Sequence, residues 1–159
     1  MLAQPLTMIR AVRPDLSPLS RAILEAILLN EGPIGSAQRV ARGLGLSRFQ
    51  LARVLRREGL PPLHVIGDWA MVLSWLVTAE RDDVSLCWMA FHGGRHPSTC
   101  YRLIREVTGL TWEEVRARGS GWAQQEFLKQ LRPRVAASAP AGHGPQAHHS
   151  SSELAQWPR

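Results

Sequence analysis

The spacing of the apolar residues constrains this chain more than any other feature of its sequence. Apolar side chains recur every three or four residues almost throughout, as in Leu51, Val54 and Leu55, and nowhere alternate as they do in a strand. Glycine interrupts the pattern at short intervals, for example at Gly45 and at Gly93-Gly94. The sequence therefore predicts an all-α protein built from about seven short helices and no sheet.

The positive charge of the chain is concentrated in one short segment. Over all 159 residues the net charge is +6, and residues 36–58, with six arginines and one glutamate, contribute +5 of it. Charge gathered in this way is typical of a face that binds a polyanion, and less typical of a general device for solubility.

Residues 37–56, AQRVARGLGLSRFQLARVLR, have the pattern of a helix-turn-helix. Ala41 is a small residue where two helices would cross, Gly45 would make the tight turn, and Leu51 and Val54 would lock the second helix onto the first. The second helix is then a candidate recognition helix for a DNA major groove. Its outward-facing residues, the first group of predicted DNA contacts, are Arg48, Phe49, Gln50, Arg53, Arg56 and Arg57.

Several of these residues have a second interpretation that does not involve DNA. Arginine can bond guanine through two hydrogen bonds and glutamine can do so with adenine. Gln50, however, lies three residues after Ser47 and would also close a capping box at the helix start. Phe49 would equally pack on the next helix, and Arg56 and Arg57 would form a solvated face. These alternatives stay open at the level of the sequence.

The second half of the chain repeats this plan with a different chemistry. Its turn lies at Gly93-Gly94, and Pro97 opens the next helix. Which glycine makes the turn is open, because Gly93 would put Met89 at the helix crossing and Gly94 would put Ala90 there. The near-neutral charge of this unit predicts weaker DNA binding than by the first. Its outward-facing candidates are Arg95, His96, Ser98, Thr99, Arg102 and Arg105.

Two stretches, ARGLGLSRFQLARVLRR at residues 41–57 and TGLTWEEVR at residues 108–116, carry a family resemblance, together with Gly93, Pro97-Ser98 and Arg102. Over residues 17–118 the chain resembles the DNA-binding domain of the AraC/XylS family of bacterial transcription regulators. The resemblance implies two helix-turn-helix units, joined by a long central helix, that read successive major grooves of double-stranded DNA. The chain departs from the family at position 94, where an aromatic residue is usual, and at Trp112, where proline is usual.

The same resemblance shapes the expectation about partners. Members of this kind usually carry a sensory domain, and the residues before the first expected helix are too few for one. We therefore expect no built-in effector domain, with RNA polymerase or a separate sensor protein as the protein partner. The alternative function is a protein–protein adaptor in a regulatory complex that uses the helix-turn-helix scaffold without DNA.

The stretch CWMAFHGGRHPSTC at residues 87–100 contains four residues of types that bind metals, Cys87, His92, His96 and Cys100. A zinc site would need all four donor atoms within about 2.0–2.3 Å of one ion, and a cysteine that locks two helices together is not free to supply this. We expect the cysteines to be packing residues, and a metal-dependent switch is the weaker alternative. No nucleophile–base pair, acid pair or phosphate-binding loop stands out, so neither an enzyme nor a cofactor is predicted.

The overall composition limits where the protein can be located and how its chain is organised. No stretch reaches the roughly 18 apolar residues that span a bilayer, and no export signal is evident. With only two cysteines, a cytoplasmic protein without a membrane partner is expected. The expected parts are a flexible N-terminal segment (1–16), a first helix-turn-helix subdomain (17–60), a linker helix (61–82), a second helix-turn-helix subdomain (83–119) and a mostly disordered tail (120–159) in which residues 122–131 could form a weak helix.

Overall fold

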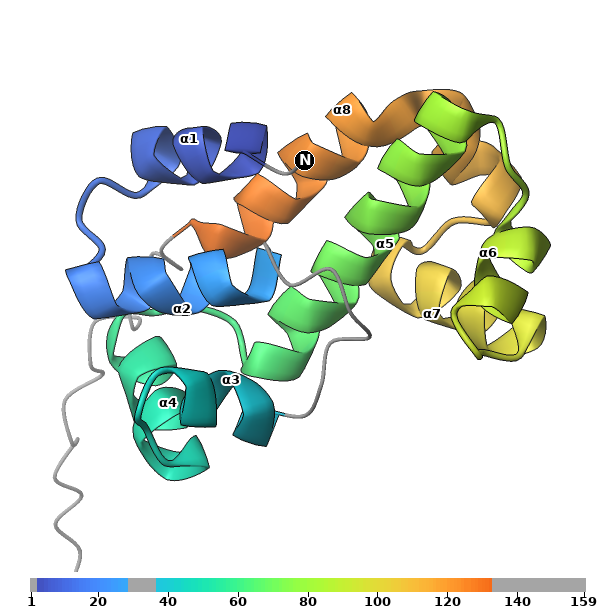
Figure 1. Ribbon diagram of the computed structural model, residues 1–159. Helices are drawn as coiled ribbons and strands as arrows, with labels where there is room; N and C mark the ends of the chain where they lie inside the picture. Colours follow the sequence, from blue (N-terminus) through green and yellow to red (C-terminus); the bar gives the residue numbers. More distant parts are fainter. Residues whose placement is uncertain (1–2, 29–36, 133–159) are drawn as a thin grey trace, which may run out of the picture.

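Helices account for most of the residues that the computed structural model describes, which are residues 3–28 and 37–132. These described ranges contain eight helices and no strand, so the all-α class is confirmed. The helices in chain order are α1 (Ala3–Val12), α2 (Pro18–Leu28), α3 (Ala37–Gly43), α4 (Arg48–Arg57), α5 (Leu63–Asp82), α6 (Leu86–His92), α7 (Pro97–Thr108) and α8 (Trp112–Leu131) (Figure 1). None of them is both long enough and apolar enough to cross a membrane.

Side chains at the turns fix where the later helices begin. Ser47 precedes α4, and its hydroxyl accepts a hydrogen bond of 3.2 Å from the Gln50 N–H. The Gln50 side-chain oxygen accepts one of 2.8 Å from the Ser47 N–H, which completes a capping box. Thr111 and Glu114 form the same reciprocal pair at the start of α8. These bonds satisfy N–H groups that the first turn of a helix otherwise leaves without a partner.

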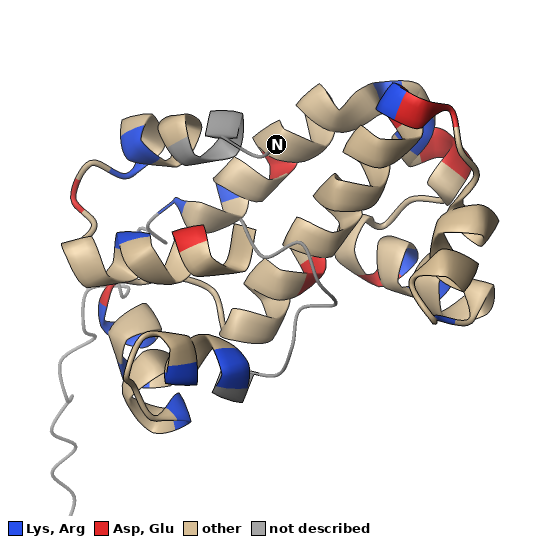
Figure 2. Ribbon diagram, in the orientation of Figure 1, with Lys and Arg blue, Asp and Glu red and all other residues tan. Residues whose placement is uncertain are grey.

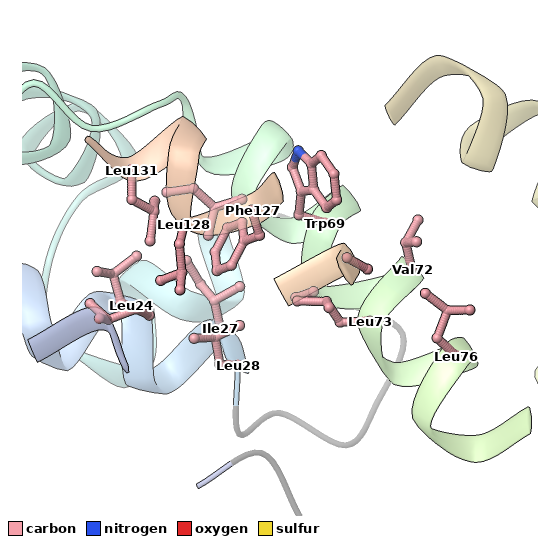
Figure 3. Packing of buried hydrophobic residues seen from close by; sticks show 14 of the residues in the cluster. Leu24, Ile27, Leu28, Trp69, Val72, Leu73, Leu76, Phe127, Leu128 and Leu131 are labelled. Carbon is pink, nitrogen blue, oxygen red and sulfur yellow. The ribbon is translucent and has the colours of Figure 1, made fainter. Parts of the chain in front are cut away.

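Helix α5 is the spine around which the other helices pack. At 1.5 Å per residue its 20 residues extend about 30 Å. Helix α2 packs on it, α8 runs along it, and Figure 1 shows the α3–α4 pair and the α6–α7 pair on opposite sides of it. In the core the rings of Trp69 and Phe127 lie 6.2 Å apart between centroids (Figure 3). The long central helix that the sequence predicts is thus a buried structural axis.

The prediction of a flexible segment over residues 1–16 is wrong for residues 3–16, the part of it that the structure describes. Residues 3–12 form α1, which packs against α8 and α2. Ile9 and Leu16 are each only 3% exposed, and both belong to the hydrophobic core. The partners that bury them come mainly from the far end of the chain, so the local pattern of this short segment held too little information to predict its order.

The prediction of a mostly disordered tail from residue 120 is wrong for residues 120–131, although the weak helix considered for residues 122–131 is confirmed. These residues form the second half of α8, in which Ala123, Phe127 and Leu131 are buried against α1, α2 and α5. Gly119, with a φ of 82°, bends the helix where the sequence suggests a break. The helix resumes because both the N–H and the hydroxyl of Ser120 donate to the Glu80 carboxylate. Residues 133–159, the rest of the expected tail, lie outside the described part of the chain.

Candidate nucleic-acid interface

The two helix-turn-helix units have the same layout at a constant offset of 49 residues. The offset holds for the first residues of three successive helix pairs. The helices of the third pair, α5 and α8, each run for 20 residues. These first residues are Ala37 and Leu86 for α3 and α6, Arg48 and Pro97 for α4 and α7, and Leu63 and Trp112 for α5 and α8. The chain therefore contains two copies of one helix–turn–helix–long helix unit.

The two turns share their backbone geometry. Gly45 has a φ of 67° and Gly94 a φ of 64°, values in the left-handed region that glycine adopts without a steric cost. In both units the residue after the glycine donates its N–H to the carbonyl of the crossing alanine, Ala41 or Ala90, at 2.8 Å. Each alanine is 1% exposed. The register that the sequence left open is therefore settled, with Gly94 and not Gly93 as the turn residue.

The inner faces of α4 and α7 hold the second helix of each unit in place. Leu51 and Leu55 of α4 are at most 2% exposed, and so are Cys100 and Ile104 of α7, which stand at the matching positions. Burial is the main cause that raises the pKa of the Cys100 thiol, so this cysteine stays protonated and packs as a small apolar residue. The opposite face of each helix is thereby turned toward solvent.

The outer face of α4 is basic and largely without acidic partners. All six residues predicted for DNA contact on this helix are exposed, as are Arg39 and Arg42 on α3. Within the described residues only Arg57 of these arginines has a carboxylate within reach, with its Nη2 4.0 Å from Glu58 Oε1. Figure 2 shows α3 and α4 carrying basic residues and no acidic ones. Such a face attracts the phosphates of a nucleic acid.

Two of the open interpretations on α4 are decided by side-chain positions. Phe49 is 69% exposed and so does not pack on the next helix. The guanidinium carbon of Arg48 lies 4.7 Å from the centroid of the Phe49 ring, in a cation–π contact. The Gln50 side chain closes the capping box, so its oxygen is already engaged at 2.8 Å. Base reading by Gln50 would require that this bond be given up.

An open recess of about 480 Å³ lies beside the first turn, between α3 and the start of α4. Residues of the turn line it together with two arginines and one phenylalanine. The residues that line it are Ala41, Arg42, Gly45, Leu46, Ser47, Arg48 and Phe49.

In the second unit, several of the six residues predicted to contact DNA are partly buried or already bonded to other side chains. Arg95 is half-buried, whereas the other five are exposed. The His96 Nδ1 accepts the Ser98 N–H at 3.3 Å and lies 2.7 Å from the Ser98 hydroxyl, so His96 serves as the N-cap of α7. Arg102 has its Nε 3.7 Å from Glu106 Oε1. Thr99 and Arg105 complete the exposed set.

Residues 49 positions apart in the two units differ in a way that was not predicted from the sequence. Only two arginines of the first unit's outer face, Arg53 and Arg56, recur in the second unit, as Arg102 and Arg105. At four other positions the charge is lost or reversed: Trp88 stands in place of Arg39, Phe91 of Arg42, Pro97 of Arg48 and Glu106 of Arg57. Because Trp88 is 47% and Phe91 70% exposed, α6 presents aromatic surface where α3 presents charge.

The four candidate metal ligands are engaged in other contacts. The Cys87 sulfur lies 3.8 Å from the Tyr101 hydroxyl, and the His92 ring stacks on Trp88 at 3.8 Å between centroids. His96 caps α7 and Cys100 is buried. In the described ranges no group of three or more histidine, cysteine, aspartate or glutamate side chains is placed to hold a metal ion.

No protein-family model, curated protein or solved structure matches this chain. The geometry and charge of the interface are therefore the observations that indicate what it can bind.

Proposed function

We propose that this protein binds double-stranded DNA in a sequence-specific manner, as a bacterial transcription regulator of the AraC/XylS kind. The observation that carries the proposal is the arginine face of α4, which is exposed, almost free of acidic partners and presented by a helix-turn-helix. A second unit of the same layout supports it, because a repeated reader suits two neighbouring sites on one duplex.

In this proposal the two ends of α4 have different roles. The N-terminal turn, with Arg48 and Phe49, approaches base edges in the major groove. Arg53, Arg56 and Arg57 follow along the helix and contact phosphates, which position the helix but carry no sequence information. Helix α7 enters the adjacent major groove with fewer free charges, so the first unit supplies most of the affinity.

The length of the spine is compatible with this arrangement. Helix α5 extends about 30 Å, and successive major-groove sites on one side of a duplex lie about 34 Å apart. A buried helix of this length would hold the two units at a constant separation. The protein would then favour two half-sites about one helical turn apart.

A second candidate function is a protein–protein adaptor, with RNA polymerase or a separate sensor protein as the partner. The observation that favours it is the exposed aromatic surface of Trp88 and Phe91 on α6. The two functions are compatible, because the basic surface lies on the first unit and the aromatic surface on the second.

Selection of bound sequences from a random duplex pool, followed by titration of the best duplex at several salt concentrations, tests the proposal. We expect one or two enriched half-sites, and log K that falls linearly with log salt with a slope that reports several phosphate contacts. Absent or salt-independent binding to the selected duplexes would contradict DNA binding. The test uses the full chain, so the first unit does not have to be isolated.

A further inference from the structure

The ring of Phe49 is an unusual feature of the basic face on α4. Among the described residues of α3 and α4 it is the only large apolar side chain that is mostly exposed, at 69%. It stands in the first turn of the recognition helix, with exposed arginines around it. A single exposed apolar side chain needs no explanation by itself, but the position of this one and its contacts do.

The contacts of Phe49 give its ring a defined place. The Arg48 guanidinium lies over the ring with its central carbon 4.7 Å from the centroid, and Phe49 is one of the residues that line the recess beside the turn. Arg42 lines the same recess. The surface thus offers one apolar ring between cationic hydrogen-bond donors.

A surface of this composition matches one feature of duplex DNA. In the major groove a thymine presents an acceptor oxygen and, beside it, the apolar C5 methyl group, and phenylalanine is among the residues that contact this methyl. The surrounding phosphates match the arginines. An acidic protein surface would match the charges but offers no reason for an apolar ring at their centre.

The remaining side chains of this turn narrow the choice of base reader. The Gln50 oxygen already accepts the Ser47 N–H at 2.8 Å, so a two-bond contact with adenine would require that this bond be given up. Arg48 and Phe49 are the side chains of this turn that would meet base edges without breaking a capping bond. At the matching position of the second unit stands Ser98, which has no comparable apolar surface.

We infer that Phe49 is a specificity-determining residue that contacts the C5 methyl group of a thymine in the half-site of the first unit. The inference rests on the proposed DNA-binding function and deepens it. Because Ser98 replaces the ring in the second unit, dependence on a thymine methyl is confined to one of the two half-sites.

Replacement of thymine by deoxyuridine tests this directly, since it removes the methyl group and keeps base pairing. In the duplex selected from the random pool, each thymine is replaced singly, and binding is measured by fluorescence anisotropy. For the unchanged protein we expect a loss of about fourfold at one thymine of one half-site, the factor expected from one buried methyl group. Replacement of any other thymine by deoxyuridine should leave the affinity unchanged within twofold.

Two variants assign the effect to Phe49. Phe49→Ala should bind the thymine and uridine duplexes equally, whereas Ser98→Ala, the matched control in the second unit, should keep the discrimination of the unchanged protein. Because Phe49 is exposed, both variants should retain the helical circular dichroism of the parent. The measurement on the unchanged protein needs no variant at all.

The possible results distinguish a failure of the inference about Phe49 from a failure of the proposed DNA binding. If the unchanged protein binds its duplex and no single uridine weakens binding, or if Phe49→Ala keeps the discrimination, the inference is overturned while DNA binding stands. A selected first half-site without thymine overturns it equally. If no duplex is bound in a salt-dependent way, the proposed function is overturned and the inference with it.

Discussion

The buried guanidinium of Arg13 donates a hydrogen bond of 2.6 Å to the main-chain carbonyl of Leu131, 118 residues later in the chain. Its other terminal nitrogen donates to the Glu58 carbonyl, directly after α4, at 2.7 Å. Three further bonds with Asp15 hold the guanidinium in place. One side chain thus joins the N-terminal segment, the end of α4 and the end of α8.

Arg13→Met should lower the free energy of unfolding by about 2–6 kcal/mol, because a carbonyl that loses its donor inside the protein costs roughly 1–3 kcal/mol and two are affected. Urea denaturation measures this. The control is Arg10→Met, whose side chain is 65% exposed and whose ion pair with Glu25 lies at the surface, so its loss should stay below about 1 kcal/mol. Equal losses from both variants would mean that Arg13 does not join these segments.

Gly45→Ala should destabilise the first helix-turn-helix by about 1–2 kcal/mol, because its φ of 67° places an alanine in the left-handed region. Gly43, two residues earlier, ends α3, and nothing lies within 4 Å of an added Cβ. Gly43→Ala is therefore expected to be neutral or to stabilise by up to about 1 kcal/mol. Thermal denaturation of both variants checks the contrast, and a Gly45→Ala protein as stable as Gly43→Ala would refute the proposed turn geometry.

Asp68 on α5 should make the fold less stable as the pH rises. Burial raises the pKa of its carboxyl, and Glu106 adds to this, whereas His64 and Arg95 oppose it. A carboxyl whose pKa is raised in the folded state stabilises the fold below its unfolded pKa and loses that contribution as the pH rises through the folded value. Asp68→Asn should therefore have a higher Tm than the parent at pH 7, and the difference should disappear near pH 3.

Asp15→Asn provides a test of opposite sign. The hydrogen bond from Arg13 is the main reason that the pKa of the Asp15 carboxyl is lowered, so its contribution to stability is present at neutral pH and is lost on acidification. We expect a lower Tm than the parent at pH 7 and convergence toward pH 3. Shifts of the same sign for the two asparagine variants would contradict the assignment of one of the two environments.

Arg53→Ala should weaken DNA binding more than Arg102→Ala, although the two residues occupy matching positions. Arg53 has no carboxylate within ion-pair distance in the described residues, while Arg102 lies 3.7 Å from Glu106 on a nearly neutral unit. Salt titrations should show the slope of log K against log salt reduced by about 0.9 for each phosphate contact removed. Equal or reversed losses would show that the charge difference between the units does not govern affinity.

The features predicted correctly were those that depend on a few neighbouring residues. The capping box of Ser47 and Gln50 joins residues three apart, and the turn at Gly45 depends on one backbone conformation. The sequence narrowed the second turn to two glycines, and the choice needed the packing of Ala90 at the crossing. Of the predicted contact residues, the sequence indicated exposure correctly for most. It did not indicate that Arg102 lies near Glu106.

By itself the sequence determined the helical class, the two turns and the concentration of charge on residues 36–58, because each follows from local spacing or composition. Only the tertiary structure decided that α1 and the second half of α8 belong to the core. Each of these segments has too few apolar residues to be ordered alone. Ile9 and Phe127 are buried because α1 packs against α2 and α8, and α8 packs against α5, with Arg13 bonded to the carbonyl of Leu131. Such burial depends on partners far away in the sequence, which no local pattern contains.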